Sequence, residues 1–337
     1  MPLKIAINGF GRIGRMVVRA ILESKRKDIQ VLAINSLNSI KGDAYLLQYD
    51  SVHGILPERV VHGDSFIQIG DQSQIRMVSQ REPQSLPWRE LGVDIVLECT
   101  GKFTKRELAM AHIAAGAKRV LISAPADDAD LTVVYGVNHD RLNAQSIIVS
   151  NASCTTNCLA PIAKILHEAI GIETGYMTTV HSYTGDQSLV DTSHKDLRRS
   201  RAAALSMIPT STGAARAIGV VLPQLKGRLD GVSIRVPTAN VSLVDLVFNA
   251  SRDCTAEEIN GLAKAASESA AMKGVLAYST EELVSIDFNH HPASSIFDAT
   301  QTAVIGKRLV HINCWYDNEW GFSNRMLDTA VAMGQSL

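Results

Sequence analysis

Two residues have the types and surroundings of a nucleophile and its base. Cys154 lies in SNASCTTNC at 150–158, directly after an expected strand and at the start of an expected helix at 154–170. A helix N-terminus lowers the pKa of a thiol through the helix dipole and its free N–H groups, which suits a nucleophile. His181 ends an expected strand in the polar run HSYT and is the candidate base. We expect its imidazolium to keep Cys154 reactive near neutral pH, although a lone histidine in a strand is more often structural.

The other cysteines have less distinctive surroundings. Cys158 lies one helical turn after Cys154, on the same face of the expected helix,. It is either a resolving or metal-ligating thiol or, as is commoner, a small buried residue. Cys99, Cys254 and Cys314 lie in or beside apolar runs and are expected to be structural. An odd number of cysteines in a long chain does not indicate a disulfide framework, and we expect no metal site.

Three segments carry groups that bind anions. KDLRRSR at 195–201 is basic, and PTSTG at 209–213 offers hydroxyl and backbone N–H groups before an expected helix,. Arg235 is a charge inside an expected strand and needs a partner if buried,. Each is weak evidence alone, because a basic run is usually a solvated surface. Together they predict a substrate with one or two anionic groups.

The N-terminal run GFGRIG at 9–14 has the glycine pattern G-x-G-x-x-G of dinucleotide-binding folds,. It follows an expected strand at 3–8 and begins an expected helix, which is the context that the motif requires. Gly9, Gly11 and Gly14 are therefore expected to let the backbone approach a pyrophosphate at the helix N-terminus,.

The residue that would contact the adenosine ribose is not acidic. Many NAD-binding proteins place a carboxylate against the ribose 2′-hydroxyl, about 20 residues after the glycines. Here the second expected strand ends at Asn35, and Ser36 follows without a carboxylate. The absence removes one hydrogen bond to the hydroxyl and one charge that would repel a 2′-phosphate, so this position alone is equally compatible with NAD and NADP.

The elements that must position these residues fall into two groups. Strands alternate with helices in the first part of the chain, which predicts a Rossmann-type, doubly wound parallel sheet. After about residue 151 the segments alternate in polarity, which predicts an α+β catalytic domain with a mostly antiparallel sheet covered on one face. The expected strands are 3–8, 30–35, 93–99, 119–123, 132–138, 146–151, 176–183, 231–238 and 241–250, and the expected helices 15–23, 107–115, 154–170, 255–271 and 319–335.

The domain boundaries follow from this change. We expect a dinucleotide-binding domain at 1–153, a catalytic domain at 154–318 and a C-terminal helix at 319–337. Between the later strands, residues 184–212 lack a clean period and are expected to form a long ordered loop. Loops of that length are usually functional.

Composition limits the classes of function. The chain has 337 residues, of which 46% are hydrophobic and 20% charged, and its formal net charge is −1. The hydrophobic content excludes intrinsic disorder as the main state. The net charge, which is close to zero, does not indicate binding of the whole molecule to nucleic acid or to an anionic membrane. The N-terminal run lacks the apolar region of a signal peptide, and no stretch approaches the roughly 18 apolar residues of a spanning helix. We expect a cytoplasmic protein.

Along essentially its whole length the chain resembles the phosphorylating glyceraldehyde-3-phosphate dehydrogenase family. The specific block is SNASCTTNC at 150–158, and the other matching motifs are INGFGRIGR at 7–15, HSYTGDQ at 181–187, HKDLRRSRAA at 194–203, PTSTGAA at 209–215, RVPT at 235–238 and WYDNEWG at 315–321. The resemblance implies a homotetramer whose C-terminal helix packs back on the first domain. It also implies the reversible conversion of glyceraldehyde 3-phosphate and inorganic phosphate to 1,3-bisphosphoglycerate, with hydride transfer to NAD or NADP through a thioester.

The same resemblance assigns roles to individual residues. Cys154 would be the nucleophile and His181 the base. The implied cofactor contacts, beside the three glycines, are Arg12, Ile13, Arg81, Ser123 and Asn318. The implied site for the substrate phosphate consists of Thr184, Arg199 and Arg235, and that for inorganic phosphate of Ser153, Thr155, Thr212 and Gly213.

The chain departs from the NAD-using members of this family in two places. Many of them have Asp where this chain has Ser36, and Leu-Pro where it has Thr192-Ser193. Chloroplast members that accept NADP resemble Ala-Ser-His at the second place, where this chain reads Ser193-His194. Both changes remove discrimination against a 2′-phosphate, and Ser193 can donate a hydrogen bond to it. We therefore predict use of NADP, or of both cofactors.

Two other interpretations stay open. Erythrose-4-phosphate dehydrogenases share the fold and the cysteine but resemble Ser-Ala-Met-His-Asp-Gln where this chain has residues 182–187. Thr184 in that run favours the triose phosphate. The second alternative is a catalytically silent binding protein on the same scaffold, against which the intact Cys154, His181 and Arg235 count.

Overall fold

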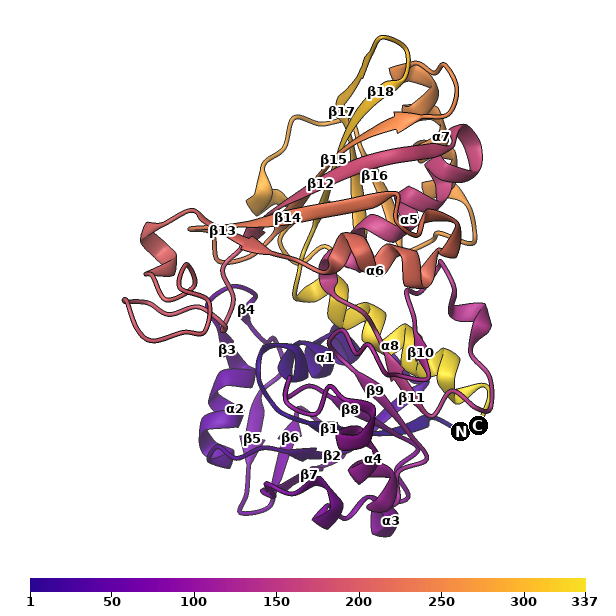
Figure 1. Cartoon of the computed structure of the whole chain (residues 1–337). Helices are drawn as coiled ribbons and strands as arrows, with labels where there is room; N and C mark the ends of the chain where they lie inside the picture. The colour runs from indigo at the N-terminus through magenta and orange to yellow at the C-terminus, as the bar shows by residue number, and fades with distance from the viewer. The chain divides into compact units, whose positions relative to one another are not determined.

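The computed structural model describes residues 1–337, which divide into two compact units. The first unit comprises Met1–Val133, His139–Ala152 and Ser323–Leu337. The second comprises Val134–Asn138 and Ser153–Phe322. Figure 1 shows the helices and strands of each unit. No helix combines the length and the apolarity that a membrane crossing requires.

A nine-stranded sheet forms the centre of the first unit, in the order β10-β11-β9-β8-β1-β2-β7-β6-β5. All pairs from β10 to β7 are parallel, and β6 and β5 extend the sheet with antiparallel pairs. This confirms the expected doubly wound class. The strands are β1 (Leu3–Asn8), β2 (Ile29–Asn35), β5 (Val60–His62), β6 (Phe66–Ile69), β7 (Ile75–Val78), β8 (Ile95–Glu98), β9 (Arg119–Ile122), β10 (Leu131–Thr132) and β11 (Ile148–Ser150).

Four helices of the first unit come after strands of this sheet along the chain, and the fifth, the last helix of the chain, comes after the last strand of the second unit. They are α1 (Arg12–Glu23), α2 (Ile40–Gln48), α3 (Trp88–Leu91), α4 (Arg106–Ala114) and most of α8 (Trp320–Gly334), and a small separate pair, β3 (Tyr49–Asp50) and β4 (Gly54–Ile55), completes the unit. Every residue of β8 and β9 is buried, as a strand with both faces covered requires,. Helix α1 begins at Arg12, three residues before the expected start, because the glycine loop turns directly into it.

One expected strand is wrong. Residues 132–138 contribute only the end of the two-residue β10, after which the chain turns. Gly136 has a positive φ of 83°, and the Val137 N–H donates to the Val134 carbonyl at 3.0 Å. The turn ends the strand, although the run itself is apolar and β-branched.

The last helix is fastened to the sheet of the first unit. Arg119 of β9 is 3% exposed, and its guanidinium donates to the Met333 carbonyl at 2.7 Å and to the Ser336 hydroxyl at 2.7 Å. Thr329 donates to the Asn151 side chain at 2.8 Å. The carbonyls at the C-terminal end of α8 are thereby satisfied by a buried cation, which also complements the helix dipole.

The second unit is built on a seven-stranded sheet in the order β13-β14-β12-β15-β18-β17-β16. Figure 1 shows α5 (Cys154–Ile170) and α6 (Ala214–Val221) lying along this sheet, and α7 (Ala256–Glu268) packs on β16 and β17. The strands are β12 (Ile172–Ser182), β13 (Ile208–Ser211), β14 (Leu229–Val236), β15 (Ser242–Ala250), β16 (Leu276–Ser279), β17 (Ser295–Ile305) and β18 (Leu309–Tyr316).

The sheet is mostly antiparallel, as expected, but two of its pairs are parallel. These are β12 with β14 and β16 with β17. The connection between β12 and β14 contains the segment 184–212, which includes β13, and also α6. It is long enough for the chain to return to the starting end of β12, so that β14 runs parallel to it. The segment 184–212 has little regular structure, and its only elements are a 3₁₀ turn at Ala203–Leu205 and β13.

Candidate active site

The structure brings Cys154 and His181 together. Cys154 is the first residue of α5, whose N-cap Ser153 accepts the Thr156 N–H at 3.0 Å. The turn into the helix is tight, because Ala152 has a positive φ of 56°. His181 lies near the end of β12 and is 4% exposed. Its Nε2 is 3.5 Å from Cys154 Sγ, which is within reach of a proton transfer between them,.

The surroundings favour the neutral forms of both groups. Burial raises the pKa of the Cys154 thiol, and the Arg235 charge acts in the opposite direction. Burial, together with Arg235, lowers the pKa of His181 to about 3. Burial thus acts against the expected thiolate–imidazolium pair at both groups, and that pair stays a prediction. Burial outweighs the helix N-terminus at Cys154, and a sequence does not show how deeply a thiol is buried.

Arg235, on β14, lies against the far side of the imidazole. Its Nη1 is 2.8 Å from His181 Nδ1 and donates to the Ser182 carbonyl at 3.1 Å. The same Nδ1 is 2.7 Å from that carbonyl. In the tautomer whose ring proton is on Nδ1, directed at the Ser182 carbonyl, Nε2 is free to accept the thiol proton,. A second proton on the ring would add a cation beside Arg235, which adds to the larger effect of burial in lowering the pKa of the imidazole,.

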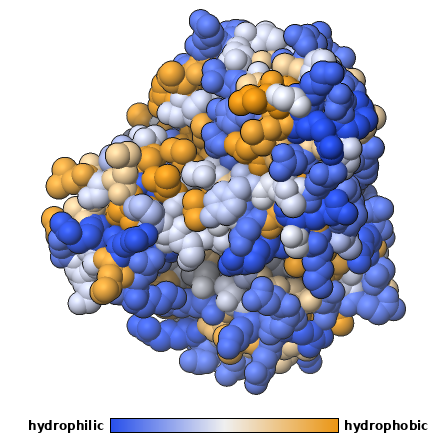
Figure 2. Space-filling model, turned by 45° about the horizontal axis from the view of Figure 1, so that its top comes forward, coloured by the Kyte–Doolittle hydropathy of each residue, from blue (hydrophilic) through white to orange (hydrophobic).

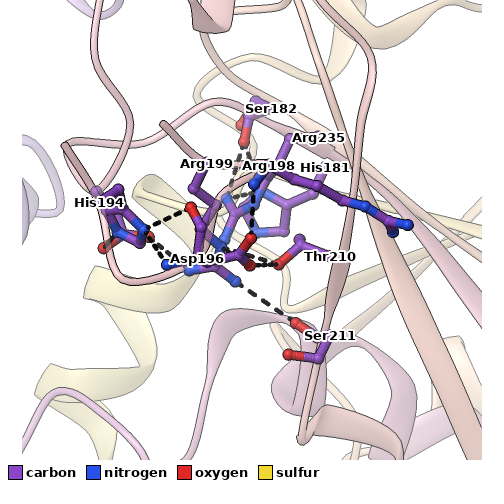
Figure 3. A network of polar contacts seen from close by, with 10 residues as sticks. His181, Ser182, His194, Asp196, Arg198, Arg199, Thr210, Ser211 and Arg235 are labelled. Carbon is purple, nitrogen blue, oxygen red and sulfur yellow. Dashed lines mark hydrogen bonds and ion pairs between the residues drawn. The ribbon is translucent and has the colours of Figure 1, made fainter. Parts of the chain in front are cut away.

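Arg199 and its neighbours form a polar network in the segment 184–212 (Figure 3). Arg199 Nε donates to the Thr210 hydroxyl at 2.8 Å, and its Nη1 forms an ion pair with Asp186. Thr210 also donates to Asp196, at 3.2 Å. Arg199 is close enough to His181 to lower its pKa, although Asp186 partly neutralises the guanidinium. Of the expected substrate-phosphate residues, Arg199 and Arg235 both face the base, and Thr184 follows the end of β12 two residues after Ser182.

The expected inorganic-phosphate residues lie at the N-termini of α5 and α6. The two helix starts are adjacent, since Thr156 of α5 contacts the Ala214 carbonyl of α6 at 3.5 Å. Gly213 is the N-cap of α6, and the Thr212 hydroxyl accepts the Ala214 N–H at 3.2 Å. Two converging helix N-termini favour an anion. The hydroxyls of Ser153 and Thr155 are engaged within the protein, by Thr156 and Tyr316 respectively.

Tyr316 is a residue of this site that sequence reasoning missed. Its ring packs edge-on against His181 with centroids 6.0 Å apart, and its hydroxyl is 2.8 Å from the hydroxyls of Thr155 and Thr179. The only signal was its place in WYDNEWG. Asn318, from the same run, accepts hydroxyl hydrogen bonds from Ser182 at 2.8 Å and Ser242 at 2.9 Å. Its amide NH₂ therefore remains available as a donor.

The sequence left two roles open for Cys158, and the structure supports that of a small buried residue. Its side chain is fully buried, and Sγ is 3.6 Å from the Ser295 hydroxyl. Burial raises its pKa well above the usual value for a thiol. All five cysteines are free, and the chain holds no group of three or more His, Cys, Asp or Glu side chains arranged for a metal ion.

In the first unit a cavity of about 410 Å³ lies at the carboxyl ends of the parallel strands. Its wall includes four of the expected cofactor residues, namely Gly9, Gly11, Ser36 and Arg81. Arg12, Ile13 and Gly14 lie just beyond it in α1, and Ser123 directly follows β9. Ser193 and Asn318 belong to the second unit. A cavity at this edge, beside a helix N-terminus, fits the phosphate and ribose of a dinucleotide.

The three glycines are required for different reasons. Gly9 has a φ of 95°, and a Cβ there would lie 2.7 Å from the Thr100 nitrogen. A Cβ on Gly14 would lie 2.3 Å from the Gly9 carbonyl oxygen. Gly11 has open space around it and an ordinary φ of −77°. The fold therefore needs Gly9 and Gly14, whereas Gly11 leaves room for something outside the chain.

Arg12, at the start of α1, is held by Asp50. Its guanidinium forms an ion pair with that carboxylate, which also accepts the N–H groups of Val52 and His53, both at 2.9 Å. Burial alone would raise the pKa of Asp50, but these donors lower it to about 2. The cation is thereby fixed at the same helix end that the glycine loop leaves open.

The sequence is similar to a family of known enzymes. The family model described as the glyceraldehyde 3-phosphate dehydrogenase C-terminal domain matches residues 153–318, and that for its NAD binding domain matches residues 3–106. The relatives that carry the name glyceraldehyde-3-phosphate dehydrogenase include the following three bacterial proteins. The protein of Cereibacter sphaeroides is 62% identical over 337 residues and 100% of both chains. That of Xanthobacter flavus is 61% identical over 99% of both chains, and that of Geobacillus stearothermophilus 54% identical over 98% of both.

Both parts of the site lie in the matched regions. The cavity with its glycine loop falls in the matched NAD binding domain, and the thiol, the imidazole and both groups of anion-binding residues fall in the matched C-terminal domain. Since relatives this similar extend over the full chain, it belongs to the glyceraldehyde-3-phosphate dehydrogenase family, whose members are oxidoreductases that use glyceraldehyde 3-phosphate, phosphate and a nicotinamide cofactor.

Proposed function

We propose that this chain oxidises and phosphorylates glyceraldehyde 3-phosphate reversibly, through a thioester on Cys154. The observation that carries the proposal is the 3.5 Å approach of His181 Nε2 to Cys154 Sγ at the start of α5. In this proposal residues 1–153 bind the dinucleotide, together with the helix at 319–337, and residues 154–318 hold the substrate. The five free thiols favour a reducing cytoplasm as its location,.

The residues divide the chemistry between them. His181 Nε2 accepts the proton of the Cys154 thiol as the sulfur attacks the aldehyde carbon, which gives a thiohemiacetal. The Cys154 backbone N–H and the imidazole stabilise the oxyanion as it forms. His181 returns the thiol proton to the oxyanion, which becomes the hydroxyl of the thiohemiacetal. It then takes the hydroxyl proton back while hydride leaves the carbon, and a thioester remains. The nicotinamide, when bound, accepts that hydride. Inorganic phosphate then attacks the thioester and releases the sulfur, which takes the proton from His181.

The arrangement of the anion sites supports this sequence of steps. Arg235 and Arg199 lie on the imidazole side of the thiol and would hold the phosphate of the substrate. The N-termini of α5 and α6, with Thr212 and Gly213, would hold inorganic phosphate beside the same sulfur. The amide NH₂ of Asn318, whose oxygen is engaged by Ser182 and Ser242, is a donor for the carboxamide of a nicotinamide.

The test is a burst of reduced cofactor measured before phosphate is added. Cys154→Ala is expected to abolish the burst, because no thioester can form. Cys158→Ala, which removes a buried thiol four residues away on the same helix, is expected to retain it. A full burst from Cys154→Ala rules out the mechanism.

We further propose that the chain accepts NADP at least as well as NAD. Ser36, where many NAD enzymes have a carboxylate, lines the cavity of the first unit. The charged side chains in the same wall are Arg81, Lys102 and Glu82, two cations against one carboxylate. A carboxylate about 4 Å from a 2′-phosphate would cost about 4 kcal/mol at an effective dielectric of about 20, before screening by solvent and salt.

The cofactor proposal is tested by the ratio of kcat/KM for NADP over NAD. The wild-type ratio is expected to be one or higher. In the double variant Ser36→Asp, Ser193→Pro it should fall, because a repelling charge is added and a donor is removed. A wild-type ratio far below one that the double variant does not change contradicts the proposal and indicates an enzyme specific for NAD.

We also propose that the chain works as a homotetramer. The segment 184–212 exposes five large apolar side chains, more than a solvated loop normally carries: Leu189 84%, Val190 73%, Leu197 83%, Leu205 85% and Met207 75%. Figure 2 shows hydrophobic residues gathered on the lobe at the left, where this segment lies. Large exposed apolar patches mark interaction sites, of which a contact between subunits is one kind. Light scattering after gel filtration should give four times the chain mass, and Leu205→Asp should lower it; a monomeric wild type contradicts the proposal.

A further inference from the structure

Glu98, the last residue of β8, is a fully buried carboxylate that accepts hydrogen bonds from four donors. Oε1 accepts the Thr100 N–H at 2.8 Å and also the Thr100 hydroxyl. Oε2 accepts the Asn8 amide at 2.6 Å and contacts His112 Nε2 at 3.0 Å. The side chains of Glu98 and His112 have no exposed surface. No Lys or Arg side chain pairs with this carboxylate.

The contact with Trp88 shows which ring nitrogen of His112 carries the proton. The indole Nε1 of Trp88 lies 3.0 Å from His112 Nδ1. An indole N–H only donates, so Nδ1 must accept and the ring proton is on Nε2. That N–H donates to Glu98. Asn8 Nδ2 and His112 Nε2, which are 3.4 Å apart, are then both donors directed at the same carboxylate oxygen.

The hydrogen bonds continue from Asn8 to the wall of the dinucleotide cavity. The Asn8 oxygen accepts the Asn35 amide at 2.7 Å. The Asn35 oxygen accepts the Gln80 backbone N–H at 2.8 Å, and its amide donates to the Gln80 carbonyl at 2.9 Å. Asn8, Asn35, Gln80 and Thr100 all line the cavity. One carboxylate thus connects the ends of β1, β2 and β8 with the loop after β7.

Only a group that accepts at both oxygens fits this network. If Gln replaced Glu98 with its NH₂ at the Oε1 position, that NH₂ would face the Thr100 backbone N–H, which cannot reverse. With the NH₂ at the Oε2 position, it would face the His112 N–H, whose tautomer Trp88 fixes. Rotating the amides of Asn8 and Asn35 by half a turn would only move the mismatch. The rotated Asn35 would direct its NH₂ at the Gln80 N–H and its oxygen at the Gln80 carbonyl. A buried donor without an acceptor costs roughly 1–3 kcal/mol.

We propose that Glu98 is a positioning residue for the dinucleotide, and that its carboxyl group sets the shape of the cavity through Asn8, Asn35 and Thr100. It need not touch the cofactor, since each amide in the series has one orientation only while the carboxylate is present. The inference rests on the proposed binding of a dinucleotide in this cavity. Glu98 keeps the cavity of the unbound protein in the shape that the dinucleotide requires. Fewer side chains then have to become ordered on binding, so less conformational entropy is lost.

The test compares dinucleotide binding by wild type and Glu98→Gln, measured by isothermal titration with NAD and with NADP. The variant is expected to bind both at least tenfold more weakly. Its KM for the dinucleotide should rise by a similar factor, while kcat at saturating dinucleotide and the rate of Cys154 alkylation without cofactor stay close to wild type. A Kd within twofold of wild type overturns the inference. If the wild type itself binds no dinucleotide, the proposed function fails as well.

Asp298 provides the matched control in the second unit. It is also a buried carboxylate, 3% exposed, and it accepts a threonine N–H, that threonine's hydroxyl and an indole N–H, from Thr300 and Trp315. Asp298→Asn should lower the melting temperature as Glu98→Gln does and leave the dinucleotide Kd unchanged. An equal loss of affinity in both variants means that Glu98 acts only through stability and overturns the inference.

A second variant keeps the test decisive if Glu98→Gln does not fold. Asn35→Ala breaks the series at its end near the cavity, where Asn35 is 6% exposed. It should increase the hydrogen-exchange rate of the Gln80 amide, which loses its acceptor, and raise the dinucleotide Kd. An unchanged exchange rate together with an unchanged Kd overturns the inference.

Discussion

In the proposed mechanism Arg235 and Thr212 belong to two different anion sites, so their substitution should separate the two. Arg235→Leu is expected to raise the KM for the triose phosphate and to slow hydride transfer, because binding of the remote phosphate orients the reacting carbon. Thr212→Ala should mainly raise the concentration of inorganic phosphate required for half-maximal rate. Steady-state kinetics with each substrate varied in turn measures both. The same pattern from the two variants would show that the sites are not separate.

Arg235 also influences the protonation of the Cys154–His181 pair. Its charge lowers the pKa of both groups, and burial is the larger cause in each case. Arg235→Leu should therefore raise both pKa values. The rate of Cys154 alkylation by iodoacetamide against pH should shift to higher pH, and Arg235→Lys, which keeps the charge, should shift it less. An unshifted profile in Arg235→Leu would mean that solvent screens the guanidinium.

Residue identities were easier to predict than their electrostatics. Cys154 was predictable because the motif and its place after a strand both indicate a helix start. His181 was one of 10 histidines, and only its polar neighbours and the family motif distinguished it. The burial of both groups and the approach of Arg235 to His181, which change their pKa values, were not predictable, because they are tertiary properties that join residues 54 positions apart in the sequence. Tyr316 was missed for the same reason, since its contacts come from α5 and β12.

The glycine loop between β1 and α1 allows the needs of the fold and of the ligand to be tested apart. Gly14→Ala is expected to destabilise the protein, since its Cβ would lie 2.3 Å from the Gly9 carbonyl oxygen. Gly11→Ala has open space and should leave the melting temperature without cofactor within about a degree of wild type. It should nevertheless weaken dinucleotide binding, because the methyl group would occupy the approach of the pyrophosphate. Thermal unfolding with and without NAD measures both effects, and unchanged stabilisation by NAD in Gly11→Ala would contradict this position for the pyrophosphate.

At the level of elements, prediction succeeded where a pattern was local. The strands at the N-terminus and the helix at 154–170 have continuous apolar or helical periods, and the structure has them with bounds that differ by few residues. The strand expected at 132–138 failed because the turn at Gly136 interrupts an otherwise suitable run. The parallel pairs β12–β14 and β16–β17 were not predictable, since strand direction in a mixed sheet depends on connections whose path a periodicity does not show.

For the whole molecule, the buried base makes stability depend on pH. The pKa of His181 is about 3 in the folded protein and near 6.5 when unfolded. The unfolded chain therefore binds a proton that the folded one excludes, so stability is complete above pH 6.5 and is lost as pH falls toward 3. Between pH 7 and pH 5 this single group should remove about 2 kcal/mol from the free energy of unfolding. His181→Asn should lose less over that interval in urea titrations; an equal loss would show that other groups cause the acid sensitivity.

The attachment of α8 to Arg119 has a consequence for the synthesis of the chain. Arg119 is made early, but Met333, the acceptor of its guanidinium, lies 214 residues later in the sequence. At translation rates of about 5–20 residues per second, that interval lasts on the order of 10–40 s. During this interval the nascent chain on the ribosome contains most or all of the strands of the parallel sheet but not the last helix, and Arg119 lacks its hydrogen-bond acceptors. The first unit, although most of it is made early, can be completed only once α8 has been synthesised, so a folding chaperone that meets the chain before then would meet that open sheet.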